Sequence, residues 1–200
     1  MSLHEELWQQ LIKLDPAQTA QRANCEYLPE SDCYVITFLN NQYSVNIQDE
    51  QISATKPDAE PTPASFTEQL CILAYLINAK DLPLSGKLVK AESLPGGQFF
   101  FRGPHELPTK KLSQTFGQNP QLIYEAADSL NPKKCEFGDA AIEIIALPRI
   151  PLTFVIWEAD EEFDARASIL FDQTAAEHFL LDALLTAVTS AVNAIIKNPE

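Results

Sequence analysis

Basic residues are scarce in this chain: its 200 residues include 14 Lys and Arg against 28 Asp and Glu, which gives a formal net charge of −14. A field of this sign repels the phosphates of nucleic acids and anionic membrane surfaces. The bases are also scattered, and they do not form the stripe that nucleic-acid binders present. We therefore expect no nucleic-acid partner and no membrane partner.

Long apolar runs are missing as well. No stretch reaches the length of about 18 apolar residues that crosses a bilayer. The N-terminal segment MSLHEELWQQLIKL carries acids where a secretory signal carries bases, and it has no continuous apolar stretch. These absences predict a cytoplasmic location.

Cysteine and histidine are too scattered to predict a metal site. The sequence lacks Cys-x-x-Cys and His-Glu-x-x-His spacings, the glycine-rich phosphate and dinucleotide loops, and the Gly-x-Ser-x-Gly nucleophile elbow. We interpret the cysteines as buried, reduced thiols; a zinc or iron–sulfur site held by all four is the alternative. The four are Cys25, Cys33, Cys71 and Cys135. Motifs therefore identify neither a reaction nor a cofactor.

The chain is instead rich in patterned segments, with 46% hydrophobic residues. Apolar residues at helical spacing predict helices over residues 3–14 and 66–79, two more between 108 and 130, and a long last helix that ends near 197. A short second helix begins at Asp15-Pro16. Capping boxes at Ser65–Glu68 and Thr174–Glu177 mark the start of the third helix and of the last one.

Three further groups of residues are rich in β-formers. A first hairpin joins residues 34–39 and 42–47 through two asparagines, and a second joins 87–93 and 98–102 through Gly96-Gly97. A block of three strands covers 137–172. Helices and hairpins that do not alternate as strand–helix–strand predict an α+β fold, with a mainly antiparallel sheet packed with helices and a long C-terminal helix.

Residues 48–64 are polar and contain three prolines, which predicts a linker or surface loop. We divide the chain into N-terminal helices and hairpin (1–56), a linker or loop (57–64) and a main α+β domain (65–200). One continuous domain is the alternative, and the pattern leaves this choice open. No internal repeat is evident in the sequence.

Two groups of residues in the three-strand block are candidates for chemistry. The turn after Trp157 contains four carboxylates, among them Glu158 and Asp160; it suits a hard cation, or it is a solvated turn that protects a sheet edge. Asp172 and His178 suit a general base, or they form a capping arrangement with a partly exposed histidine.

Arg102 and Arg149 stand beside glycine or proline in apolar surroundings. An internal ion pair of Arg149 with Asp139 or Glu143 is one interpretation. The other is an open guanidinium that receives a carboxylate or phosphate of a substrate.

Two stretches carry a resemblance to a known family: LPGGQFFFRGPHEL, and FGDAAIEIIALPRIPLTFVIWEADEEFDARASILFD. They contain the glycine turn with Phe100, Arg102 and His105, then FGDAA, LPRIPL and WEADEEF, and finally ILFD followed by His178 and Asp182. Over roughly residues 20–195 the chain resembles a family catalogued as a domain of unknown function, number thirty-seven eighty-six. This family is met mainly in anaerobic bacteria and archaea.

Some members of that family look fused to a small cysteine-rich iron–sulfur domain of the kind found near corrinoid-dependent methyl transfer. The cysteines of this chain lack the close spacing of that domain. The resemblance thus implies an anaerobic setting with a redox or corrinoid partner protein, and it brings no catalytic residues with it.

Our leading hypothesis is a cytoplasmic binding or accessory protein that recognises a small molecule or a redox or corrinoid partner protein. Its ligand residues, at the ends of the central sheet, are Arg102, His105, Arg149, Trp157 and Glu158. The alternative is a metal-assisted hydrolase or lyase that uses Glu158, Asp160, Asp172 and His178. A third hypothesis, a structural subunit, predicts a broad exposed apolar patch on the final helix. A shared site requires the glycine-turn segment and the three-strand block to lie in one sheet; the sequence identifies no ligand, metal or oligomeric state.

Overall fold

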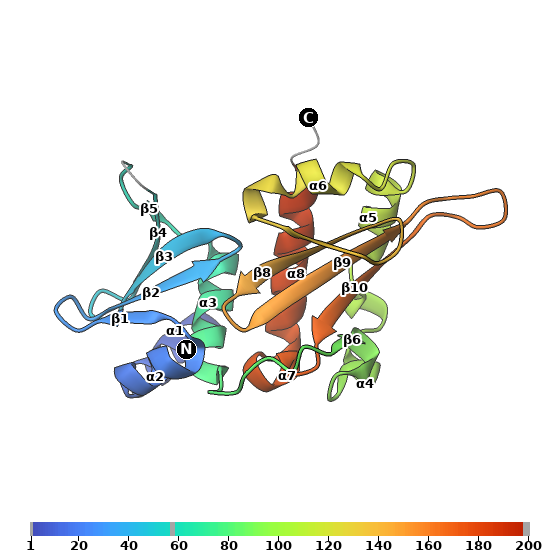
Figure 1. Ribbon diagram of the computed structural model, residues 1–200. Coiled ribbons are helices and arrows are strands. Elements are labelled where there is room, and N and C mark those ends of the chain that lie inside the picture. Colours follow the sequence, from blue (N-terminus) through green and yellow to red (C-terminus); the bar gives the residue numbers. More distant parts are fainter. Residues whose placement is uncertain (1, 57–58, 198–200) are drawn as a thin grey trace.

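The computed structural model describes residues 2–56 and 59–197, which form two antiparallel sheets with helices on their inner faces (Figure 1). The first half of the chain runs through two helices, a sheet of strand order β1-β2-β3-β4-β5, and a longer helix. Its elements are α1 (Leu3–Leu11), α2 (Pro16–Ala23), β1 (Glu26–Leu28), β2 (Cys33–Phe38), β3 (Asn41–Asn46), β4 (Gln51–Thr55), β5 (Thr62–Pro63) and α3 (Phe66–Asn78).

The second half forms a sheet of strand order β6-β10-β9-β8-β7. Its β6 follows the connection from α3, and its long last helix, α8, lies behind the sheet in Figure 1. Its elements are β6 (Leu88–Lys90), the 3-10 turn η1 (Ala91–Ser93), α4 (Gly97–Phe100), η2 (Gly103–His105), α5 (Thr109–Phe116), α6 (Leu122–Ala126), η3 (Asp128–Leu130), β7 (Lys133–Cys135), β8 (Ala140–Leu147), β9 (Ile150–Trp157), β10 (Arg166–Asp172), α7 (Ala175–His178) and α8 (Leu181–Ile196). The α+β class, the antiparallel pairing and the long C-terminal helix are confirmed.

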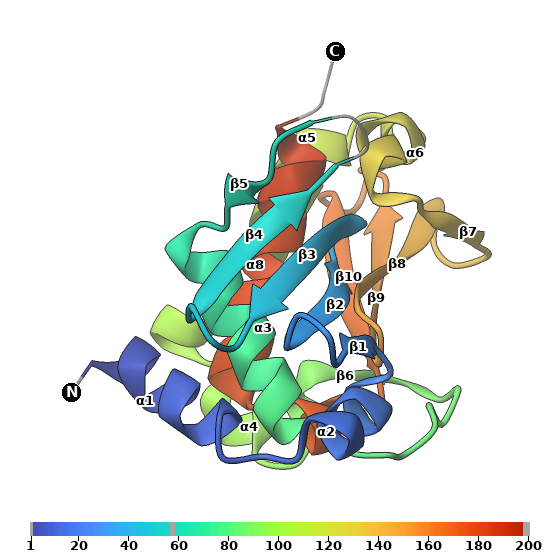
Figure 2. The same ribbon diagram turned by 90° about the vertical axis from the view of Figure 1, so that its left-hand side faces the viewer.

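Apart from β5, the segment from β6 to η2 and the short turns η3 and α7, the two halves follow the same order of elements: two helices, an antiparallel meander of four strands (β1–β4 and β7–β10), and a long helix. α1 and α2 contact α3, just as α5 and α6 contact α8. Equivalent elements also meet between the halves, because α3 contacts α8 and β2 contacts β8 (Figure 2). In a two-fold arrangement, each element at the interface contacts its own equivalent in the other half, as α3 and α8 do here. The structure therefore shows a repeat of topology that the sequence does not reveal.

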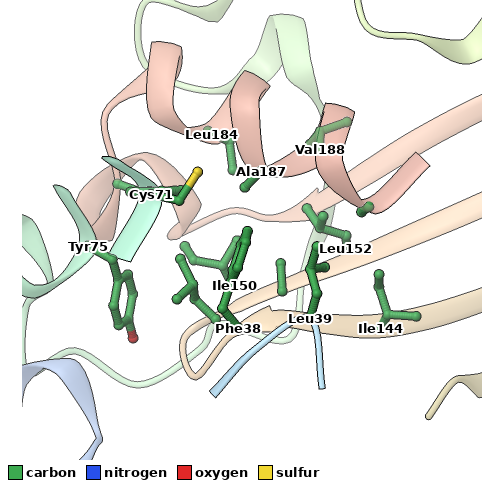
Figure 3. Close-up of a cluster of buried hydrophobic side chains, with 14 of the residues drawn as sticks. Phe38, Leu39, Cys71, Tyr75, Ile144, Ile150, Leu152, Leu184, Ala187 and Val188 are labelled. Carbon is green, nitrogen blue, oxygen red and sulfur yellow. The ribbon is translucent and has the colours of Figure 1, made fainter. Parts of the chain in front are cut away.

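One hydrophobic cluster extends through both halves. Phe38 and Leu39 at the end of β2 lie in the same cluster as Ile150 and Leu152 of β9, with α8 beside them (Figure 3). The backbone N–H of Leu39 also donates to the carbonyl oxygen of Ala146 at 2.9 Å, so the two sheets are joined directly. Within the described residues, no helix has the length and apolar character needed to cross a membrane.

Local signals account for several elements. The Ser65–Glu68 capping box is present at the start of α3, and Asp15 caps α2 with Pro16 in its first turn, as predicted. The predicted β2–β3 hairpin is present, but its turn lies one residue earlier than predicted: Leu39 and Asn40, with positive φ values of 47° and 61°, form the turn, and Asn41 already belongs to β3. The predicted helix break at Asn119-Pro120 separates α5 from α6.

The prediction of a second hairpin at the glycine turn is wrong. β6 is a strand, but Gly97 begins the helical turn α4, and the chain does not return as a second strand. A Cβ at Gly97 would overlap the carbonyl oxygen of Ala91, so this glycine permits a close backbone approach. Phe101 then enters the core and stacks on Phe171 of β10. β6 itself pairs with β10, so this segment and the three-strand block share one sheet.

The start of the last helix also differs from its prediction. Thr174 makes no capping bond to the helix; its hydroxyl donates to the Asp172 carboxylate at 2.6 Å. Helix α7 lasts one turn, because Phe179 adopts an extended conformation and inserts into the core against Tyr75. Helix α8 begins after this break.

The predicted loop over residues 48–64 is wrong in two parts, which form strands, while the other described residues of this range are turns or have no regular structure. Gln51–Thr55 forms β4 and pairs with β3, and Thr62–Pro63 forms β5 at the sheet edge. Proline is tolerated in β5 because an edge strand leaves one side of its backbone unpaired. Residues 57 and 58, the first two of the predicted linker, lie outside the described residues.

Candidate functional site

Arg149 lies in the turn between β8 and β9, and each nitrogen of its guanidinium has a partner within the protein. Its Nε donates to the Arg22 carbonyl at 2.8 Å and its Nη1 to the Leu82 carbonyl at 3.0 Å. Its Nη2 forms an ion pair with Asp81 at 3.0 Å. The guanidinium is therefore engaged by the protein itself, and it fastens the segment that follows α3.

The predicted carboxylate partners of Arg149 are wrong. Asp139 lies at the opposite end of the sheet, where its carboxylate accepts from the Glu158 backbone N–H at 2.8 Å. Glu143 pairs instead with Lys133 across β8 and β7, at 3.7 Å. The Arg149–Asp81 ion pair is not visible in local sequence, because Asp81 belongs to a distant segment of the chain.

Asp172 is buried at the end of β10 and accepts five hydrogen bonds. The donors are the backbone and hydroxyl of Ser85 at 3.1 and 3.0 Å, the backbone of Gly86 at 2.7 Å, and the backbone and hydroxyl of Thr174 at 2.9 and 2.6 Å. Burial alone would raise the pKa of this carboxyl, but the hydrogen bonds from Thr174 and Ser85 outweigh burial and lower the pKa to about 2. Asp172 is thus a stable, charged anchor.

His178 is fully buried, so the interpretation as a partly exposed histidine is wrong. Its Nδ1 accepts from the Lys80 backbone N–H at 3.3 Å, and its Nε2 makes no hydrogen bond within the described residues. Burial lowers the pKa of His178, the nearby charge of Arg149 lowers it further, and Asp172 only partly offsets these effects. The oxygens of Asp172 are occupied by Ser85, Gly86 and Thr174, so the two side chains do not form a carboxylate–histidine couple.

These three residues act on one segment, residues 80–86, which leads from α3 to β6. Arg149 binds Asp81 and Leu82, Asp172 binds Ser85 and Gly86, and His178 binds Lys80. Glu177 adds an ion pair with the Lys80 ammonium at 2.6 Å. Together these side chains hold the connection between the two halves of the molecule. We call this set of contacts on residues 80–86 the connector lock.

The acidic turn lies at the other end of the sheet and extends away from the body of the molecule (Figure 1). The Arg166 guanidinium stacks over the Trp157 ring at 4.6 Å. Asp160 accepts from the backbone N–H groups of Glu162 and Phe163 at 2.8 and 2.7 Å, which folds the tip of the turn. These contacts of the acidic turn stabilise the conformation of the turn itself.

Arg102 and His105 lie on a third part of the surface, just after α4 and beyond the edge strand β6. Both residues are exposed. The His105 ring stacks in parallel on the Phe100 ring at 4.6 Å.

The structure does not bring the predicted ligand residues together. Trp157 pairs with Arg166 at one end of β9 and β10, and Leu152 pairs with Phe171 at the other end. With about 3.3 Å per residue along a strand, Asp172 lies roughly 20 Å from the acidic turn. Glu158 and Asp160 are thus separated from Asp172 and His178, and the described residues contain no cluster of three or more His, Cys, Asp or Glu side chains suited to a metal.

The cysteines are free thiols and do not gather at one place. Cys33 and Cys71 are buried as predicted, while Cys25 and Cys135 are half-buried. Burial raises the pKa of Cys25 and of Cys71 to about 12, so both stay protonated at neutral pH.

A cavity of about 660 Å³, here called the central groove, lies between the two halves. One wall comes from the β2–β3 hairpin and the start of α3, and the other comes from one side of α8. Apolar side chains such as Phe38 and Leu130 line it together with hydroxyl and amide groups. The α8 wall contributes Thr186, Thr189, Ser190 and Asn193.

Glu68 and Tyr43 form a hydrogen-bonded pair in the wall of the central groove. The Tyr43 hydroxyl donates to Glu68 at 2.7 Å, and the Ser65 backbone N–H donates to the other carboxylate oxygen at 2.6 Å. Burial raises the pKa of Tyr43, and the bond to Glu68 raises it further. Burial acts to raise the pKa of Glu68 as well, but the bonds from Tyr43 and Ser65 outweigh it and lower that pKa. The carboxylate is therefore charged and already compensated by its neighbours and by the positive end of α3.

The central groove was not predicted from the sequence. One signal was available: Thr186, Thr189, Ser190 and Asn193 follow helical spacing on the side of α8 opposite its buried face. The other wall comes from residues more than a hundred positions earlier, which no local pattern connects to α8. The exposed apolar patch predicted on the final helix is absent from the described residues of α8, where this polar stripe lines the groove; the exposed Leu180, which belongs to the predicted helix, directly precedes α8.

A protein-family model described as "Domain of unknown function (DUF3786)" matches residues 15–194. Its number is that of the family whose motifs the sequence resembles. No curated protein and no solved structure matches the chain.

Proposed function

Since the chain belongs to the DUF3786 family, whose description names no activity, we propose from the geometry that it is a binding protein that holds a small, mainly uncharged polar molecule in the central groove. The observation that carries the proposal is a groove of about 660 Å³ at the junction of two repeated halves. Small-molecule sites have volumes of about 300–1,000 Å³ and favour junctions between structural units.

The lining of the groove indicates the class of ligand. Thr186 and Thr189 donate their hydroxyl protons to helix carbonyls at 2.8 Å, which leaves their oxygens as acceptors. Tyr43 likewise donates to Glu68 and retains acceptor capacity. Beside these polar groups, Phe38, Leu39 and Leu130 supply apolar contact. A molecule with hydroxyl or amide groups on one side and an apolar part on the other fits this lining.

The charged side chains that line the central groove favour an uncharged ligand. The Glu68 carboxylate is compensated by its hydrogen bonds, and Lys197 is the other charged side chain among the described lining residues. Glu68, Thr186 and Thr189, which could act as a base or as nucleophiles, are already engaged in hydrogen bonds within the protein. The groove therefore supports binding in preference to catalysis.

A thermal-shift screen of sugars, polyols, nucleosides and small amides tests the proposal. A compound present at a hundred times its Kd stabilises the folded state by about 2.7 kcal/mol. For a chain of this size we expect a rise in Tm of about 5–10 °C. Ser190→Phe, which fills the groove from the α8 wall, should abolish the rise.

Gln9→Phe is the matched control, because it places the same aromatic ring at an exposed position of α1 outside the groove. It should keep the full response. A compound that stabilises the wild type and Ser190→Phe equally would place its site elsewhere, and the absence of any response across these classes would contradict the proposal.

Several finer statements stay predictions: the anaerobic setting, the redox or corrinoid partner protein, the cytoplasmic location, and ligand contacts by Arg102, His105, Arg149, Trp157 and Glu158. The metal-assisted hydrolase or lyase gains no support from the geometry, because its four residues lie at opposite ends of the second sheet.

A further inference from the structure

A second, smaller groove lies between α1, α3 and the start of α8. We call it the three-helix groove; its volume is about 190 Å³. Leu70, Cys71 and Ala74 of α3 lie between the other two helices, which contribute Leu3 and Leu180 among others. The lining is mainly aliphatic, in contrast to the hydroxyl and amide groups of the central groove.

Large apolar side chains stand exposed around this groove. Leu3 is 60% exposed and Leu180 is 54% exposed, although both line the groove. Phe66, one helical turn before Leu70, is 62% exposed. Single exposed leucines are common, but three large apolar residues beside one apolar groove form the kind of patch that marks an interaction site.

The charges around the three-helix groove are of one sign. The helices α1, α3 and α8, covering Leu3–Leu11, Phe66–Asn78 and Leu181–Ile196, contain no lysine and no arginine. Their ionised side chains are carboxylates, and one of these, Asp182, lines the groove itself. The net charge of −14 adds a long-range attraction for cations.

We propose that the three-helix groove docks a basic amphipathic helix of a partner protein. A volume of about 190 Å³ is below the range of about 300–1,000 Å³ for small-molecule sites, and it suits the side chains that anchor a docked helix. Helix-in-groove recognition places apolar residues of the ligand helix in such a groove, one or two turns apart. Lysines or arginines at the edge of that helix would face Asp182.

Fluorescence anisotropy with a labelled leucine–lysine peptide, designed with leucines on one helical face and lysines on the other, tests this proposal. We expect saturable binding that weakens as salt is added, because the charges are at the surface. A peptide with glutamate in place of every lysine should bind at least tenfold more weakly. Equal binding of the two peptides would overturn the proposal.

Two variants with matched controls locate the binding. Leu180→Ser should weaken binding by about tenfold, the effect of losing one buried leucine contact; serine is also a favoured residue at this N-cap position, so the helix start is kept. Leu122→Ser makes the same change at an exposed leucine that starts α6, and it should have no effect. Asp182→Asn should weaken binding several-fold, while Asp164→Asn, with the same charge change in the exposed acidic turn, should not.

Equal loss of binding in each variant and its control would attribute the interaction to net charge or to non-specific hydrophobic binding. That result would overturn the proposed docking site. Sedimentation equilibrium addresses another occupant. A concentration-dependent dimer that Leu180→Ser abolishes would show that a second copy of this chain covers the groove, and the partner-helix proposal would then be wrong. The central groove is tested separately, because Ser190→Phe should leave peptide binding unchanged.

Discussion

Arg149 and Asp172 hold the same segment of chain with opposite charges. Arg149 supplies donors to the carbonyl of Leu82 and to Asp81, whereas Asp172 accepts from the backbone N–H groups of Ser85 and Gly86. A loop without secondary structure must satisfy its backbone polar groups elsewhere, and these two side chains do so. Residue types that are typical of active sites serve here to fix the connection between the halves.

The buried carboxylate of Asp172 gives a direct test of the connector lock. Asp172→Asn keeps the shape of the side chain but turns one acceptor toward its donors as an NH2 group. We expect the free energy of unfolding to fall by about 2–3 kcal/mol, measured by urea denaturation. Asp164→Asn, at an exposed position, should change it by less than about 0.5 kcal/mol. If Asp172→Asn left the free energy of unfolding unchanged, the hydrogen bonds of Asp172 in the connector lock would add no stability.

The same carboxyl predicts a dependence of stability on pH. The pKa of Asp172 is lowered from 3.8 to about 2 in the folded chain. The folded state therefore binds this proton less readily than the unfolded state, and the contribution of Asp172 is present above pH 4 and is lost as the pH falls toward 2. The loss amounts to about 2 kcal/mol. Denaturation curves between pH 5 and pH 2 should show this component in the wild type but not in Asp172→Asn.

At the scale of the element, capping signals predicted a boundary only where no distant contact competed with them. Ser65 and Glu68 start α3 as the sequence indicates, because both partners belong to the same turn. Thr174 and Glu177 have the same spacing, yet Thr174 bonds Asp172 and Glu177 pairs with Lys80. Phe179 then leaves the helix for the core, since burying a phenylalanine outweighs one capping bond.

The candidate grooves were harder to predict than the helices for a related reason. Each is assembled from elements that are far apart in sequence, as Tyr43 of β3 and Ser190 of α8 are in the central groove. The residues that attracted attention as candidates, among them Arg149, Asp172 and His178, do lie close together, but around the connector. Residue type singled out these three side chains, but the sequence placed Arg149 in one candidate site and Asp172 and His178 in another, and it predicted neither their common place nor what they bind.

Gly97 gives a prediction at the scale of the element. Its missing side chain allows the turn at α4 to approach the Ala91 carbonyl, so Gly97→Ala forces the backbone of η1 or α4 to move. We expect a loss of about 2 kcal/mol or more in the free energy of unfolding. Gly103→Ala is the control: it has a positive φ of 56° but no atom near its Cβ position, so its cost should be about 1 kcal/mol. Equal costs would show that the close approach is unimportant.

At the scale of the whole molecule, the two repeated halves share one core. Leu184, Ala187 and Val188 of α8 belong to the same buried cluster as Phe38 and Leu39 of the first half (Figure 3). α3 and α8 also contact each other directly. An interface built from core residues couples its two sides, because neither half can expose it to water without a large loss of hydrophobic free energy. Repeated topology therefore does not imply independent folding.

The two tryptophans of the chain test this coupling, because Trp8 belongs to α1 of the first half and Trp157 to β9 of the second. In Trp157→Phe the fluorescence of Trp8 reports the first half, and in Trp8→Phe the fluorescence of Trp157 reports the second. In each variant we expect the fluorescence transition in urea to coincide with the loss of far-UV circular dichroism, which reports the whole chain. The comparison is made within one variant, so the cost of replacing the buried Trp8 does not affect it. A circular dichroism curve with a second step that the remaining tryptophan does not follow would mean that the halves unfold separately and that the shared cluster does not couple them.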